Sequence, residues 1–103
     1  MSKHLTPIEV VEALIGKPEV IGGICRIDPK AAFGWRHAVK RRAAGDLPYV
    51  AHMRSLLDFS RPRQLGLTAD HLIWGASEEE VAAILAARDG GQVDFATSRM
   101  AAE

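Results

Sequence analysis

The stretch KPEVIGGICRIDPKAAFGWR, residues 17–36, predicts two short helices that follow each other closely. Pro18 suits the first position of a helix, where the backbone N–H has no partner in any case. Asp28, followed by another proline, signals a second helix start, because an N-cap aspartate accepts a backbone N–H. We therefore predict helices over about 18–25 and 29–42, joined by a turn of about three residues.

The second predicted helix divides into an inner and an outer side. Helical spacing turns small and apolar residues inward, namely Ala31, Ala32, Trp35 and Val39. The outer side carries Lys30, Phe33, Gly34 and His37. Phe33 has an alternative place in the core, filling the space left by Gly22 and Gly23 in the preceding helix. Those glycines cost about 1 kcal/mol each relative to alanine, so we expect them to allow another helix to approach closely.

Start and stop signals predict further helices on both sides of this stretch. Thr6 and Glu9 form a capping box, and Ser77 with Glu80 repeats the pattern near the C-terminal end. Strand signals are weak, since no alternation of apolar and polar residues is sustained. The predicted helices are about 7–15, 18–25, 29–42, 48–59, 69–74 and 78–88.

The expected fold class is all-α, a compact bundle of five to six short helices. The chain has 103 residues, 48% of them hydrophobic, which suits one small soluble domain over residues 1–88. Residues 89–103 show no period and are expected to form a disordered tail. No apolar run approaches the roughly 18 residues that span a bilayer, and no signal peptide is recognisable, so we expect a cytoplasmic protein without membrane contact.

Chemistry-bearing residues are sparse in this sequence. Cys25 is the single cysteine, which excludes an internal disulfide and a cysteine zinc site. Its apolar flanks favour a buried small hydrophobe over the alternative of a reactive thiol. The four histidines are scattered, without a metal-binding or phosphate-binding motif. We expect no enzyme activity, no cofactor and no metal.

Charge is unevenly distributed although the formal net charge is zero. Residues 26–63 hold nine lysines and arginines against three aspartates, whereas residues 64–103 hold two arginines against seven acids. A basic middle segment is where an anionic partner such as nucleic acid would dock. The alternative for Lys40, Arg41 and Arg42 is an ordinary solvated face.

Residues 17–36 resemble the helix-turn-helix of Cro and lambda-repressor type regulators, most closely the short Cro-like proteins of phages and prophages. Pro18 stands at the family's proline position, Asp28 at its N-cap serine, and Trp35 and Arg36 at its Trp-Arg pair. The resemblance extends over about residues 6–74. One departure is Arg26, which replaces the turn glycine and must adopt a positive φ that glycine takes more easily.

The resemblance implies a DNA-binding protein whose second helix enters the major groove. Lys30 would reach guanine, Phe33 a thymine methyl, and Gly34 would let the backbone approach the bases. Flanking basic residues would contact phosphates, and His37 has the alternative of a neutral surface histidine. The residues assigned to DNA in this way are Lys17, Asp28, Lys30, Ala31, Phe33, Gly34, Arg36, His37, Lys40, Arg41 and Arg42.

Regulators of this kind usually bind as two-fold dimers. The apolar stripe of the predicted helix 78–88, together with Trp74 before it, is a candidate dimer interface. The alternative is that this stripe closes the protein's own core. The candidate interface residues are Trp74, Val81, Ile84 and Leu85.

The predicted function is a sequence-specific transcriptional regulator, a repressor that occupies its operator as a homodimer and is associated with the nucleoid. Two alternatives stay open at this point. One is an activator that recruits polymerase, and the other is an antitoxin or adaptor whose acidic C-terminal helix binds a protein partner.

Overall fold

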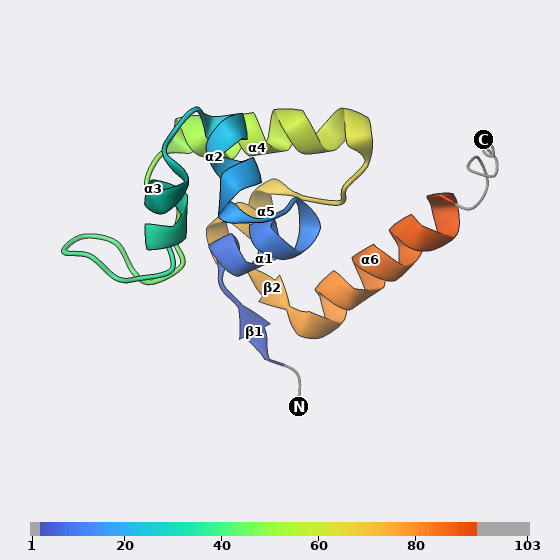
Figure 1. Cartoon of the computed structure of the whole chain (residues 1–103). Coiled ribbons are helices and arrows are strands. Elements are labelled where there is room, and N and C mark those ends of the chain that lie inside the picture. Colours follow the sequence, from blue (N-terminus) through green and yellow to red (C-terminus); the bar gives the residue numbers. More distant parts are fainter. Residues whose placement is uncertain (1–2, 93–103) are drawn as a thin grey trace.

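The computed structural model describes residues 3–92, which form six helices and one pair of two-residue strands (Figure 1). Strands β1 (His4–Leu5) and β2 (Ala76–Ser77) pair antiparallel and bring the residues before the first helix beside the segment that joins the last two helices. The mainly helical fold class is therefore confirmed, while the predicted tail beyond residue 92 lies outside the described residues. The helices are α1 (Pro7–Leu14), α2 (Pro18–Cys25), α3 (Pro29–Gly34), α4 (Val50–Arg63), α5 (Ala69–Trp74) and α6 (Glu78–Gln92).

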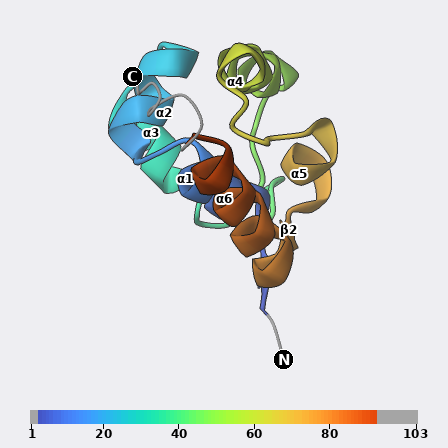
Figure 2. The same cartoon turned by 90° about the vertical axis from the view of Figure 1, so that its right-hand side faces the viewer.

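Helix α1 lies near the centre and packs mainly against α5 and α6, while α2 packs against α3 and α4 (Figures 1 and 2). Nearly every apolar side chain of α1 is buried, which is what a helix covered on several sides requires. Side chains from each neighbouring helix complete one core. Its most buried members are Ile8, Val10, Val11, Leu14, Ile21, Ala32, Leu56 and Leu72.

The predicted capping box at the start of α1 is confirmed. Thr6 Oγ1 accepts the Glu9 backbone N–H, and the Glu9 carboxylate accepts the Thr6 backbone N–H at 2.9 Å. The Thr6 N–H stabilises the charged carboxylate and thereby lowers the pKa of Glu9. This box fixes where the chain enters the centre of the fold.

Gly22 allows the chain after α2 to fold back against that helix. A Cβ atom at this position would lie 2.8 Å from the Ile27 carbonyl oxygen and 3.2 Å from the Pro29 nitrogen. Arg26 ends α2 in the left-handed conformation, with φ 61°, as the replacement of the turn glycine predicted. The expected close approach is therefore confirmed at Gly22, although a Cβ atom at Gly23 would meet open space.

The prediction that the second helix runs to residue 42 is wrong, because α3 ends at Gly34. The next N–H groups, of Trp35, Arg36 and His37, bond three residues back and tighten the helix into a last turn. The Trp35 carbonyl then accepts the Gly45 N–H at 2.7 Å, so a long-range bond takes the acceptor that a continuing helix would use. Val39, expected to face inward, is 57% exposed.

Helix α4 also differs from its predicted bounds of 48–59. It begins at Val50 and continues to Arg63, through Pro62. The extra turn is held because Ser60 is 1% exposed and accepts two N–H groups, from Leu65 to its carbonyl and from Leu67 to its hydroxyl. These hydrogen bonds at the C-terminal end of α4 thus outweigh the stop signals.

Helix α6 begins as predicted but continues four residues past its expected end at 88. Its two glycines weaken a helix without removing a hydrogen-bond donor, so they do not stop it. The strands β1 and β2 were not predicted, because two residues are too few to show alternation. Ser77 Oγ accepts the Glu80 N–H at 3.1 Å as expected, but the Glu80 carboxylate binds His71.

The two adjacent glycines of α2 provide a matched test of this packing. Gly23→Ala should stabilise the protein by up to about 1 kcal/mol, because alanine favours the helix and has free space. Gly22→Ala gains the same propensity but pushes a methyl group against the Ile27 carbonyl, and it should destabilise by about 1–3 kcal/mol. Urea unfolding of both variants measures the difference, and equal midpoints would contradict the close approach.

Candidate nucleic-acid interface

The short helix α3 has one buried and one exposed side. Ala32 is fully buried and Trp35 is 4% exposed, as predicted. Phe33 is 47% exposed, which rules out its alternative place in the core. Ala31 was expected to pack inward but is exposed, because no element within residues 3–92 covers that side of α3.

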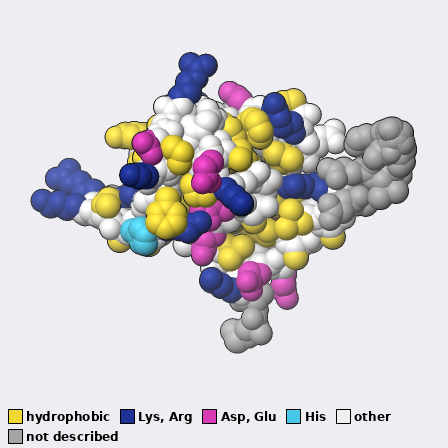
Figure 3. Space-filling view, in the orientation of Figure 1, with side chains coloured by type: hydrophobic (Ala, Val, Ile, Leu, Met, Phe, Trp, Pro, Cys, Tyr) yellow, Lys and Arg dark blue, Asp and Glu magenta, His cyan; other side chains and the backbone are white. Residues whose placement is uncertain are grey.

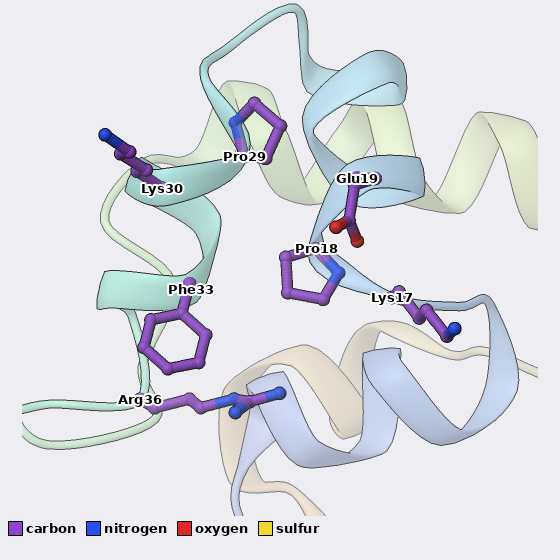
Figure 4. Close-up of a pocket in the computed structure, with 7 residues that line it drawn as sticks. All are labelled: Lys17, Pro18, Glu19, Pro29, Lys30, Phe33 and Arg36. Carbon is purple, nitrogen blue, oxygen red and sulfur yellow. The ribbon is translucent and has the colours of Figure 1, made fainter.

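A shallow hollow opens between the start of α2 and the outer side of α3 (Figure 4). Its volume is about 480 Å³. Three apolar side chains, of Pro18, Pro29 and Phe33, line it together with charged groups from both helices. The charged residues of the lining are Lys17, Glu19, Lys30 and Arg36.

Arg36 is held by α1 instead of pointing into solvent. Its Nε and Nη2 donate to the two carboxylate oxygens of Glu12 at 2.9 and 2.8 Å, and its guanidinium carbon lies 4.6 Å from the centre of the Phe33 ring. Figure 4 shows the side chain reaching from the end of α3 toward α1. Arg36 therefore orients Phe33, and a phosphate would have to compete with Glu12 for it. The sequence did not indicate Glu12 as the partner of Arg36, because the two residues are 24 positions apart.

The segment between α3 and α4 projects from the body as a loop (Figure 1). We call residues 38–44 the basic loop. Val39 and Arg42 pair as an isolated antiparallel bridge, so exposed Lys40 and Arg41 occupy its tip. Figure 3 shows lysine and arginine side chains at the end of this projection. These three basic residues, expected at the end of the predicted helix 29–42, thus lie in a loop.

Arg42 does not join its two neighbours at the tip. Its Nη1 donates to the carbonyl oxygens of Trp35 and Asp46 at 3.2 and 3.0 Å, and the residue is half-buried. The expected phosphate contact is replaced by a structural one, because these two carbonyls lie within reach of a half-buried guanidinium. Arg42 anchors the basic loop to the end of α3.

The remaining predicted DNA contacts differ in how accessible they are. Lys17, Lys30 and His37 are exposed, and His37 packs edge-on against the Phe33 ring. Asp28 caps α3, where its carboxylate accepts the Lys30 backbone N–H at 2.8 Å. Gly34 has open space around its Cα, so the backbone there is approachable.

The candidate dimer residues separate into two groups. Val81 is 4% exposed and belongs to the core, and Ile84 and Leu85 pack partly buried against it, so the stripe of α6 closes the protein's own fold. The assignment of Val81 to a dimer interface is therefore wrong, while that of half-buried Ile84 and Leu85 stays a prediction. Trp74 is 72% exposed and its neighbour Ile73 54% exposed, at the end of α5.

A buried histidine links α5 to α6. His71 Nδ1 accepts the Thr68 backbone N–H at 3.1 Å, so Nε2 carries the ring proton and donates to Glu80 at 2.7 Å. His71 is 4% exposed. Cys25 is also buried, as predicted, and desolvation raises the pKa of its thiol.

Comparisons with protein-family models, with curated proteins and with solved structures find no match for this chain. The resemblance to Cro-like regulators therefore remains a prediction from residues 17–36. Over residues 3–92, no helix is both long and apolar enough to cross a membrane. The same residues contain no group of three or more histidines, cysteines or acids able to hold a metal ion.

A double-mutant cycle tests whether Arg36 is held as the geometry indicates. Glu12→Ala, Arg36→Ala and the double variant should give a coupling of about 0.5–1 kcal/mol in urea unfolding, because the pair is bidentate and partly buried. The more exposed Lys3–Glu9 pair, at 3.7 Å, is the control and should show coupling near zero. Additive losses at Glu12 and Arg36 would contradict a formed ion pair.

Proposed function

We propose that this protein is a sequence-specific DNA-binding transcriptional regulator, and that it acts as a repressor by occupying its operator. The observation that carries the proposal is the outer side of α3. This side exposes Lys30 and Phe33 from a helix whose inner side is fixed in the core by Ala32 and Trp35. A base-reading element must be both exposed and rigidly held, and this helix meets both conditions.

The chemistry of the exposed groups fits base edges in the major groove. A lysine ammonium donates to guanine O6 and N7, and an aromatic ring packs on a thymine methyl. The ion pair with Glu12 keeps Arg36 beneath the Phe33 ring, which limits the positions that the ring can take. Lys17 at the start of α2 and the basic loop beyond α3 supply positive charge on either side, as phosphate contacts require.

Selection from a random pool of DNA duplexes tests this proposal directly. The wild-type protein should enrich a defined sequence, and Lys30→Ala should weaken binding to it by about 5–150-fold and relax the preference at one base pair. Arg61→Ala, which removes one exposed positive charge near the end of α4, is the matched control and should change affinity less than about twofold. Enrichment of no sequence would contradict the proposal.

We also propose that the protein binds DNA as a homodimer through the exposed end of α5. Ile73 and Trp74 are adjacent large apolar side chains, and Trp74 is the most exposed large hydrophobic residue in the described part of the chain. Aromatic residues with this exposure are typical of the centres of protein interfaces. Removal of α6 is not a clean test, because Val81 belongs to the core.

Surface substitutions test the dimer without opening the core. Ile73→Ser together with Trp74→Ser should convert a dimer into a monomer in light scattering and weaken operator binding by lowering the dimer population. Val20→Ser, at another exposed apolar residue, is the control and should leave the mass unchanged. A wild-type protein that is monomeric at micromolar concentration would contradict this part of the proposal.

A further inference from the structure

The basic loop is built as a rigid projection with two positive charges at its tip. The N–H of Val39 donates to the Arg42 carbonyl at 2.9 Å, and the N–H of Arg42 donates back to the Val39 carbonyl at 3.1 Å. This leaves Lys40 and Arg41 as the two residues of the turn, both exposed. Figure 1 shows that the loop extends beyond the helices, and Figure 3 shows basic side chains at its end.

The base of the basic loop is tied to the fold by hydrogen bonds. Arg42 Nη1 binds the carbonyls of Trp35 and Asp46, and the Gly45 N–H donates to the Trp35 carbonyl at 2.7 Å. The Gly45 carbonyl in turn accepts the N–H of Ile8 in α1 at 2.9 Å. An ordinary solvated loop lacks such bonds, so the tip is held in a defined position beside the end of α3.

An aromatic side chain, that of Tyr49, lies beside the basic loop and lines a hollow together with its arginines. Its lining includes Arg41, Arg42 and Tyr49, and Asp46 is the carboxylate among them. Tyr49 is 64% exposed, and its ring packs against His52 in the first turn of α4. Exposed aromatic rings among basic side chains suit the sugars and phosphates of a nucleic-acid backbone.

The dimensions of DNA distinguish the roles of helix and loop. The major groove is about 12 Å wide and admits a helix such as α3, whereas the minor groove is about 6 Å wide and admits only extended side chains. Narrow, A·T-rich minor grooves carry enhanced negative potential that attracts inserted lysine and arginine. The tip of the basic loop offers those two residue types next to each other.

We propose that Lys40 and Arg41 enter the minor groove flanking the major groove occupied by α3, with Tyr49 against the sugar–phosphate backbone at its edge. This inference rests on the proposed DNA binding and assigns a second, flanking part of the sequence preference to the basic loop. The flank should be A·T-rich, because the 2-amino group of guanine fills the minor groove of G·C pairs.

Footprinting on the duplex selected by the wild-type protein tests the loop's role. Lys40→Ala with Arg41→Ala should lose protection of the flank, keep protection of the central bases and bind about tenfold or more weakly. Arg61→Ala with Arg63→Ala removes equal charge at the far end of α4 and is the matched control, with an unchanged footprint. An unchanged footprint for the loop variant would overturn the inference.

Base analogues in the flank identify the groove. Replacing a flanking A·T pair with G·C adds a 2-amino group to the minor groove, while inosine·cytosine presents the same major groove as G·C without that group. We expect wild-type binding to weaken with G·C but not with inosine·cytosine, and this difference to vanish in the loop variant. Equal weakening by both pairs would indicate major-groove recognition and overturn the inference.

The outcomes for the two proposals are distinguishable. A selected duplex whose binding depends on Lys30 but not on Lys40 and Arg41 overturns only the role of the basic loop. A selection that enriches no duplex overturns the proposed function and, with it, this inference.

Discussion

The burial of Trp35 is the constraint on which the rest of the candidate interface depends. Its indole is 4% exposed and stacks on His52 of α4, with ring centres 5.5 Å apart. An aromatic side chain of this size buries roughly 150–250 Å², which contributes about 4–6 kcal/mol at 25 cal/mol per Å². Extending α3 by a few more residues would gain only tenths of a kcal/mol each. The buried ring therefore holds the Trp35 backbone in place, and the hydrogen bond from the Gly45 N–H to the Trp35 carbonyl ends the helix there.

The backbone of Trp35 links α3 to the basic loop. Its carbonyl accepts the Gly45 N–H and the Arg42 guanidinium, so both sides of the loop are joined at one buried residue. The outer side of α3 and the tip of the loop consequently have a fixed relation to each other. The proposed DNA contacts of these two elements need such a relation, because the distance between neighbouring grooves is set by the duplex.

The lysines and arginines of residues 26–63 fall into two groups, those that bond to other parts of the protein and those that are exposed to solvent. Arg36 is paired with Glu12 and Arg42 with two carbonyls, and each fixes a neighbouring exposed group. Lys30, Lys40 and Arg41 are exposed. Some of the basic residues therefore hold the fold in place, and others are free for the proposed DNA contacts. A count of all lysines and arginines in the segment overstates the positive charge that phosphates would meet.

Local signals in the sequence determined the helix starts and much of the core. Thr6 and Asp28 mark helix beginnings through caps that involve neighbouring residues alone, and the structure confirms both. The helices 18–25 and 69–74 also have their predicted bounds, because prolines, caps and turns near them act over a few residues. The outward position of Phe33 and the positive φ of Arg26 were likewise predicted from helical spacing and turn position within a few residues.

Tertiary structure alone decided the end of α3, the basic loop and the partners of Glu12 and His71. Each depends on a contact between residues distant in sequence, such as the Trp35 carbonyl with Gly45 or Arg36 with Glu12. The predicted helix 29–42 included Lys40, Arg41 and Arg42, whereas the hydrogen bonds of Trp35 turn that segment into a loop and use Arg42 as its anchor. Local propensity differs by tenths of a kcal/mol per residue, so a buried aromatic ring and its hydrogen bonds outweigh it.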